Sequence, residues 1–251
     1  MNNSVLRAMD VLEHLAKGPM TVTQVSRDLQ MPKTSAYDIL SALCTRGFAQ
    51  CDEHKQYTLG LSAYRIGMAY IGGTDLYSAG HARLGQLCRR LQQTVYMAVE
   101  DQGHVIYIDK AEQDSPIRFT RKVGDRNELY RTGLGKAIMA VRPELMDSLQ
   151  FPLPRITATT FCTREELLEE LQLTRQRGYA LDLGEDNRML RCIAVPILDR
   201  EGTAIGALSC SMLALEYEYA DVSVIAAELT QAALDISCAL GYTGSTLFKG
   251  E

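Results

Sequence analysis

Apolar residues near the start of the chain recur at helical spacing in three short segments. The first extends from Ser4 to Ala16, where intervals of three and four positions predict one buried face. Its predicted inward side chains are Val5, Met9, Leu12 and Leu15. A Thr-x-x-Gln capping box at Thr21 begins a second, short helix, and a third begins with Pro32 in its first turn. We therefore predict three helices, with a tight turn between the second and the third.

The segment from Phe48 to Leu59 alternates between apolar and polar residues on either side of the polar stretch 52–55. This pattern predicts two short strands joined by a turn. Three helices followed by a hairpin, in this order, are typical of a winged helix-turn-helix. We predict such a DNA-binding domain over residues 1–60, followed by an apolar linker helix over 61–75 that packs on another surface.

Residues 76–251 carry a mixture of helical and alternating patterns. Helical spacing predicts helices over 76–91, 133–141, 163–177 and 222–240, and alternation predicts strands over 94–100, 104–110, 116–121, 193–198 and 204–212. Strands joined by short polar turns pair in antiparallel fashion. The prediction for this second domain is therefore an α+β fold, an antiparallel sheet flanked by helices.

Charge is distributed unevenly between these two parts. The chain has 251 residues, of which 46% are hydrophobic, and a formal net charge of −5. Residues 1–75 contain 7 Lys or Arg and 7 Asp or Glu, so the acidic excess lies downstream. A neutral module binds DNA phosphates only if its cations gather on one face. We therefore expect the two domains to have different partners.

Other features of the composition concern location and metals. The N-terminus lacks the basic and apolar segments of a secretory signal, and no apolar run reaches the length of a membrane span. The 7 cysteines have no Cys-x-x-Cys spacing, and the 4 histidines show no ligand spacing. We expect a cytoplasmic protein with reduced thiols and without a metal, a cofactor or a membrane partner.

The predicted third helix carries hydrogen-bond donors on the face opposite to its apolar residues. Such donors read base edges and phosphates when a helix lies in the major groove. The start of the second helix, the end of the third helix and the hairpin turn add groups that reach phosphates. The candidate DNA-binding residues are Thr23, Gln24, Lys33, Thr34, Ser35, Tyr37, Arg46, His54 and Lys55. Each of these side chains, taken alone, is more often an ordinary solvent-exposed residue without a DNA contact.

Two features of the second domain suit a bound carboxylate. The Gly-rich turn at Gly133 and Leu134 opens a helix, so unpaired N–H groups and the positive end of the helix dipole are available to an anion. Asp182 stands in an apolar stretch, and Ser209 and Ser211 share one face of a strand. These polar side chains need partners, which a ligand, the main chain or one another can supply.

Motifs of the common enzyme classes are absent from the sequence. It has no Gly-x-Ser-x-Gly elbow, Walker loop or His-Glu-x-x-His helix. Cys192 as a nucleophile would need a base close in space, and its apolar setting favours a small hydrophobic residue on a buried strand. No catalytic residue is assigned, and we do not expect an enzyme.

Several motifs together resemble the IclR family of bacterial transcription regulators, and the likeness covers essentially the whole chain. They are Met31-Pro32-Lys33-Thr34-Ser35 in the predicted helix-turn-helix, Tyr57-x-Leu59-Gly60 after the hairpin, Thr132-Gly133-Leu134-Gly135-Lys136-Ala137, Gly178-Tyr179-Ala180-x-Asp182, Arg191-Cys192-Ile193-Ala194-Val195-Pro196-Ile197-x-Asp199 and Ser209-x-Ser211. The sequence departs from the family pattern at Asp38, where an arginine is usual, at Gly184, where an acidic residue is common, at Met189, and at Met212-Leu213.

The resemblance implies a winged-helix domain, a linker helix and a GAF-like effector domain that binds a small organic molecule. It also implies homodimers, or dimers of dimers, on double-stranded DNA. The N–H groups of Gly133 and Leu134 would bind the carboxylate of the ligand. The effector-binding residues carried over by motif are Phe119, Gly133, Leu134, Asp182, Cys192, Ser209 and Ser211.

These observations favour a sequence-specific transcription regulator whose operator binding is modulated by a small organic acid, with a sugar acid or a hydroxy or keto acid preferred. One alternative is a DNA-bound structural dimer with a vestigial pocket. Another is an enzyme that acts on a small carboxylic acid through Cys192 or Asp182. Binding of an acid that depends on Asp182 would exclude the vestigial pocket, and turnover of that acid would indicate the enzyme.

Overall fold

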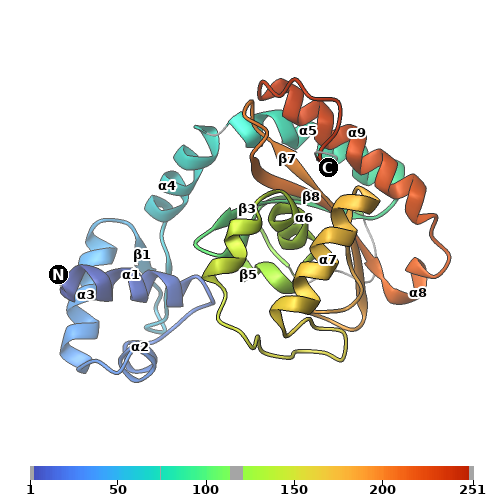
Figure 1. Cartoon of the computed structure of the whole chain (residues 1–251). Helices are drawn as coiled ribbons and strands as arrows, with labels where there is room; N and C mark the ends of the chain where they lie inside the picture. Colours follow the sequence, from blue (N-terminus) through green and yellow to red (C-terminus); the bar gives the residue numbers. More distant parts are fainter. Residues whose placement is uncertain (1–2, 74, 114–120, 249–251) are drawn as a thin grey trace. The chain divides into compact units, whose positions relative to one another are not determined.

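The computed structural model describes residues 3–73, 75–113 and 121–248 of the chain. The chain divides into two compact units, Met1–Gly73 and Thr74–Glu251 (Figure 1). Each unit has its own buried hydrophobic core.

The N-terminal unit consists of helices, then a hairpin, then a last helix. Its elements are α1 (Asn3–Leu15), α2 (Val22–Asp28), α3 (Lys33–Thr45), β1 (Ala49–Cys51), β2 (Tyr57–Leu59) and α4 (Leu61–Gly72). The predicted capping box begins α2, because the Thr21 hydroxyl accepts from the Gln24 N–H while Gln24 Oε1 accepts from the Thr21 N–H. Pro32 is the N-cap of α3 rather than part of its first turn. The predicted winged helix-turn-helix is confirmed.

The buried face of α1 differs from the prediction. Val11 and Leu15 are buried, whereas Val5 and Met9 are about half exposed, at 53% and 52%. At about 100° per residue, Val5 and Met9 lie on a different side of the helix from Val11. The prediction was right for Leu15 and wrong for Val5 and Met9, because spacing alone does not identify which of two apolar stripes meets the small core of α2 and α3.

The C-terminal unit is built on one antiparallel sheet, with the strand order β5-β4-β3-β8-β7-β6 among the described residues. The strands are β3 (Thr94–Asp101), β4 (His104–Ala111), β5 (Arg126–Glu128), β6 (Ala180–Asp182), β7 (Leu190–Leu198) and β8 (Ala204–Leu213). The long helices are α5 (Asp75–Leu91), α6 (Gly133–Val141), α7 (Arg164–Arg177) and α9 (Val222–Ala239). Helices α5 and α9 pack on one face of the sheet, and α6 and α7 cover the other (Figure 1). The predicted α+β class is confirmed.

Several short elements were not predicted. They are the three-residue strands β5 and β6, the helix α8 (Ala214–Tyr217) and the 3₁₀ helices η1 (Leu129–Arg131) and η2 (Pro143–Ser148). Elements of this length are too short to show a period, so hydrophobic patterning does not detect them. The predicted strand 116–121 lies outside the described residues except for Arg121.

Among the described helices, α9 alone has the length and apolar composition of a membrane span. Its fully buried side chains Leu229 and Ala233 belong to the core, where α9 packs against α5 and the sheet. The apolar character of α9 is therefore explained by this core packing.

Candidate functional site

The floor of the candidate site is set by the register of four strands. Cys192 on β7 pairs with Asp182 on β6 and with Ser211 on β8, and Ser211 pairs with Thr94 on β3. Side chains of one cross-strand row point to the same face of a sheet. The register therefore brings Asp182, Cys192 and Ser211 into one line, although 29 positions separate the outer two in sequence.

A second row lies two residues along the strands. Ser209 on β8 pairs with Ala194 on β7 and with Tyr96 on β3. Because side chains alternate along a strand, this row faces the same way as the first. Ser209 and Tyr96 therefore join Asp182 and Ser211 on the face covered by α6.

The N-terminus of α6 lies directly against these rows. A Cβ atom added at Gly133 would be 3.3 Å from Ala194 Cβ, 3.6 Å from Cys192 Cβ and 3.7 Å from Asp182 Cβ. The absence of a side chain at Gly133 thus keeps space open between the helix and the sheet. Thr132, the N-cap, accepts from the Gly135 N–H at 3.0 Å.

The first two N–H groups of α6 are available to a ligand. Those of Gly133 and Leu134 have no hydrogen-bond acceptor among the described residues. Unpaired N–H groups at the positive end of a helix dipole form a binding place for a carboxylate or another anion.

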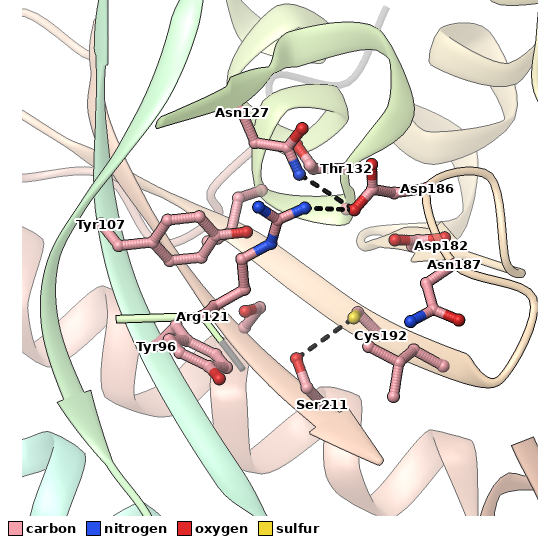
Figure 2. A pocket seen from close by; sticks show the side chains of 14 residues that line it. Tyr96, Tyr107, Arg121, Asn127, Thr132, Asp182, Asp186, Asn187, Cys192 and Ser211 are labelled. Atoms are coloured by element: carbon pink, nitrogen blue, oxygen red, sulfur yellow. Dashed lines mark hydrogen bonds and ion pairs between the residues drawn. The ribbon is translucent and has the colours of Figure 1, made fainter. Parts of the chain in front are cut away.

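A cavity of about 80 Å³ separates the start of α6 from the sheet (Figure 2). A single water needs roughly 10–15 Å³ measured in this way, so the cavity has room for a small molecule or several waters. Tyr96 lines the cavity and is only 3% exposed. Its hydroxyl has no hydrogen-bond partner within the described part of the chain. A buried hydroxyl without a partner is costly, and a polar ligand would remove that cost.

Asp182 belongs to a buried network of charged groups. Its Oδ1 accepts from the N–H groups of Gly184 at 2.9 Å and Glu185 at 3.0 Å. Lys136, which is fully buried, donates from Nζ to Glu185 Oε1 at 2.6 Å. Gly184 adopts a φ of 97°, a conformation that favours glycine and explains the departure from an acidic residue here.

The pKa values of the two carboxyl groups in this network shift in opposite directions. Burial, together with the hydrogen bond to Glu185, raises the pKa of Asp182 well above its ordinary value. Burial also acts to raise the pKa of Glu185, but the hydrogen bond from Asp182 and the charge of Lys136 lower it overall. Asp182 is therefore the carboxyl of the pair that takes up a proton more readily. Glu185 Oε2 is buried and has no hydrogen-bond partner among the described residues.

Cys192 is a neutral part of the cavity wall. Its Sγ lies 3.1 Å from Ser211 Oγ. Burial raises the pKa of this thiol well above its ordinary value. A protonated thiol is a weak nucleophile. None of the described residues that line the cavity is a histidine.

The charged side of the cavity was not predicted. Arg121 Nη2 donates to Asp186 Oδ2 at 2.5 Å, and Asn127 Nδ2 donates to the same oxygen at 3.2 Å. Asp186 also forms an ion pair with Arg131, whose Nε lies 3.0 Å from Asp186 Oδ1 and donates to Asn127 Oδ1. The Arg121 guanidinium lies between Tyr107 and Asp186 (Figure 2). This cluster gives the cavity a cation that can contact a ligand directly.

The structure brings together six of the seven predicted effector residues. Gly133, Leu134, Asp182, Cys192, Ser209 and Ser211 line this single cavity. Phe119 lies outside the described residues. Cys192 lines the cavity, as the family resemblance implied, rather than packing only as a core hydrophobic residue.

Other residues that line the cavity were not predicted from the sequence. They are Tyr96, Tyr107, Arg121, Asn127, Thr132, Asp186, Asn187 and Leu190. The alternation of β3 and β4 could have placed Tyr96 and Tyr107 on one face, where their rings now lie 5.2 Å apart between centroids. Arg121, Asp186 and Asn187 come from irregular segments without a period or a motif, whereas Thr132 belongs to the glycine-turn motif but was not assigned to the site.

The candidate DNA-binding residues lie at three places of the N-terminal unit. On α3, the side chains of Lys33, Thr34 and Tyr37 are exposed and Ser35 is half-buried. Asp38 is exposed on the same helix, so an acidic group is present among these donors.

The remaining candidates lie on α2, at the end of α3 and in the hairpin turn. Thr23, Arg46, His54 and Lys55 are exposed, whereas Gln24 is half-buried and uses its Oε1 in the capping box. Asp52 orders the turn, because its Oδ1 accepts from the N–H groups of His54 and Gln56. Within the described ranges, no cluster of His, Cys, Asp or Glu side chains could hold a metal ion.

Both units match models of one protein family. The model of the IclR helix-turn-helix domain matches residues 4–53, and that of the bacterial transcriptional regulator IclR C-terminal domain matches residues 68–238. The chain belongs to the IclR family of transcription regulators. The resemblance inferred from the sequence motifs is confirmed, and this IclR-family protein is a DNA-binding transcription regulator.

Individual relatives agree with this assignment. The HTH-type transcriptional regulator KdgR of Dickeya chrysanthemi is 31% identical over 247 residues, which cover 96% of this chain and 80% of KdgR. The crystal structure of the Thermotoga maritima IclR has a TM-score of 0.79 at 27% identity and covers 96% of this chain and 100% of that one. An IclR homolog from Microbacterium hydrocarbonoxydans, complexed with 4-hydroxybenzoate, has a TM-score of 0.84 at 21% identity, with coverage of 95% and 99%, and shares the fold.

Proposed function

We propose that this protein is a cytoplasmic, one-component regulator whose binding to operator DNA changes when a small organic acid occupies the cavity of the C-terminal unit. The observation that carries the proposal is the pair of free N–H groups at the start of α6, facing a row of buried polar side chains. A carboxylate satisfies those N–H groups, and the acid's other oxygens satisfy the polar row.

The polar row favours an acid that also bears oxygen groups. Tyr96 presents a buried hydroxyl without a described partner, and Ser209 and Ser211 add two more hydroxyls. A hydroxy acid, a keto acid or a sugar acid gives these groups hydrogen-bond partners, which a purely aliphatic acid does not. The Microbacterium homolog, which shares the fold, is complexed with a small organic acid, 4-hydroxybenzoate.

The N-terminal unit supplies the DNA-binding groups. Lys33, Thr34 and Tyr37 are exposed on α3, the helix that reads the major groove in a helix-turn-helix. Arg46, with His54 and Lys55 in the hairpin turn, is exposed and suited to phosphates. Asp38 repels phosphates, so the affinity of one copy for DNA is expected to be modest and to benefit from a dimer.

The assignment to a regulator rather than an enzyme rests on the family and on the site. Its relatives are transcription regulators. Cys192, the nucleophile of the enzyme alternative, is held as a neutral thiol in hydrogen bond with Ser211. The DNA-bound structural dimer with a vestigial pocket is less well supported, since the described polar groups leave space and free donors for a ligand.

The test uses fluorescence anisotropy with DNA fragments from the region upstream of the protein's own gene. A panel of hydroxy, keto, sugar and aromatic acids is added to the wild type, to Asp182→Ala and to Lys33→Ala. We expect one class of acid to change the DNA affinity of the wild type and to leave that of Asp182→Ala unchanged.

Lys33→Ala separates the two functions. This variant should bind DNA more weakly and lower the slope of log affinity against log salt by about one, while an acid still raises its thermal midpoint. Equal responses of Asp182→Ala and the wild type to every active acid would exclude the cavity as the effector site.

A further inference from the structure

An ion pair lies where two hollows of the C-terminal unit meet. Arg121, Asp186 and Asn187 line both the cavity at α6 and an open groove of about 590 Å³. Arg188 and Arg191 also line the groove, and Arg191 donates to main-chain carbonyls. A hollow with several guanidinium groups attracts anions, and Arg121 is the arginine that lines both the groove and the cavity.

The two partners of this ion pair depend on it unequally. Asp186 keeps Arg131 Nε at 3.0 Å and Asn127 Nδ2 at 3.2 Å when Arg121 is removed. Arg121, in contrast, has Asp186 as its one hydrogen-bond partner among the described residues. An anion that enters the cavity can therefore form an ion pair with Arg121 while Asp186 keeps its contacts with Arg131 and Asn127.

Two guanidinium groups meet one carboxylate in the ion-pair cluster at the edge of the cavity. Arg121 and Arg131 both form ion pairs with Asp186. Arg121 thus adds a cation to the helix N-terminus at Gly133 and Leu134, which binds a carboxylate without any charged side chain.

We propose that Arg121 binds a second acidic group of the effector in place of Asp186, so that the effector is a short dicarboxylic acid. One carboxylate binds the start of α6, and the other forms paired hydrogen bonds with the guanidinium. Tyr96 and Ser209 then bind hydroxyl or keto oxygens between the two ends. This inference rests on the proposed function, because it assigns the first carboxylate to the same cavity.

The test compares acids that differ only in the second carboxylate. Full-length protein is titrated by calorimetry with succinate against butyrate, and with malate against 3-hydroxybutyrate. The wild type should bind each diacid about tenfold more tightly than its matched monoacid, as expected for a hydrogen-bonded charge pair. This comparison needs no variant, so it does not depend on the folding of a mutant.

Variants then assign the preference to Arg121. Arg121→Gln should remove the preference for diacids and leave the affinity for monoacids within about threefold of the wild-type value. Arg121→Lys should keep part of the preference for diacids. Asp186→Asn should bind diacids more tightly than the wild type, since the internal competitor for Arg121 is gone. Lys122→Gln changes an exposed cation next in sequence and should behave as the wild type.

Three results would overturn the inference and leave the proposed function standing. They are equal wild-type affinities for diacids and monoacids, a diacid preference that persists in Arg121→Gln, and an equal loss of both kinds of acid in Arg121→Gln. The last result would show that Arg121 holds the first carboxylate. Failure of every acid to bind the wild type, or unchanged binding of the acids by Asp182→Ala, would overturn the proposed function as well.

Discussion

The protonation of Asp182 ties the chemistry of one residue to the stability of the fold. Its carboxyl is ionised at neutral pH in the unfolded chain, whereas burial raises its pKa in the folded chain. Between the unfolded and the folded pKa, the folded state therefore binds more protons at this carboxyl than the unfolded state does. By linkage, this group's contribution to stability is greatest at low pH and is lost as the pH rises through the folded pKa.

Asp182→Asn should preserve the network that Asp182 forms. The amide oxygen still accepts from the N–H groups of Gly184 and Glu185, and the amide N–H₂ replaces the protonated carboxyl as a donor to Glu185. We expect the free energy of unfolding to decline less than in the wild type as the pH rises above about 4, the ordinary pKa of an aspartate, because the titrating proton is gone. Urea unfolding across this range measures the difference.

Asp182→Ala is the contrasting variant. It leaves those two buried N–H groups without acceptors and should cost about 1–3 kcal/mol at every pH. If Asp182→Asn kept the full pH dependence of the wild type, the titrating proton would have to reside on another group.

The state of Cys192 predicts its reactivity. Because burial raises its pKa, the thiolate fraction at pH 8 is small, and each unit of pKa lowers it about tenfold. Iodoacetamide should label the exposed Cys51 and Cys238 at least about ten times faster than Cys192, measured by mass spectrometry of peptides. Cys192→Ser controls the peptide assignment. Rapid labelling of Cys192 would instead support the enzyme alternative.

At the scale of elements, the site depends on how closely α6 approaches the sheet. Two glycines allow this approach in different ways. Gly133 faces the cavity across side chains of β6 and β7, whereas a Cβ at Gly135 would lie 2.2 Å from the carbonyl oxygen of Leu129. The first contact involves side chains around a cavity, and the second involves main chain that cannot move aside.

Alanine at the two glycines should therefore separate binding from stability. Gly133→Ala should reduce acid binding at least about tenfold, since its methyl group enters the space of the ligand carboxylate, and should lower stability by less than about 1 kcal/mol. Gly135→Ala should lower stability by about 1–3 kcal/mol or more, because the helix must shift away from Leu129. Calorimetric titration and thermal unfolding measure the two effects. Comparable losses of stability in both variants would contradict this division.

At the scale of the whole molecule, we expect a second copy of the chain to cover the apolar surface of the N-terminal unit. Five large apolar side chains of α4 are at least 42% exposed. They are Leu61, Tyr64, Ile66, Met68 and Tyr70. On α1, Val5 and Met9 are exposed as well. Apolar helix faces of this kind are usually covered by a partner, and the sequence had already predicted that this helix packs on another surface.

Substitution on α4 should weaken the dimer and, with it, DNA binding. Tyr64 and Met68 are four residues apart and share one face of the helix. Tyr64→Glu with Met68→Glu should raise the dimer dissociation constant at least about tenfold and weaken binding to a two-half-site operator. Sedimentation velocity measures the first effect, and Arg65→Glu is the control on the same helix. An unchanged oligomeric state in the double variant would show that α4 does not form the interface.

Much of the architecture follows from local pattern. Helical spacing and strand alternation were sufficient to predict the winged helix-turn-helix, the α+β class and the helices that flank the sheet. Alternation along β8 also placed Ser209 and Ser211 on one face, and the Gly-rich turn marked the start of α6. These features depend on residues within one or two turns of each other, so the sequence carries them directly.

The sequence by itself therefore determined the longer elements, their order, the family and the glycine turn that leaves two N–H groups free. Only the tertiary structure decided the short elements, the buried face of α1, the unpaired hydroxyl of Tyr96 and the opposite pKa shifts of Asp182 and Glu185. It also decided the pairing of Arg121 with Asp186, 65 positions away, and of Lys136 with Glu185, 49 positions away. Such pairs form because the path of the chain brings distant irregular segments to one cavity, and no local period records that path.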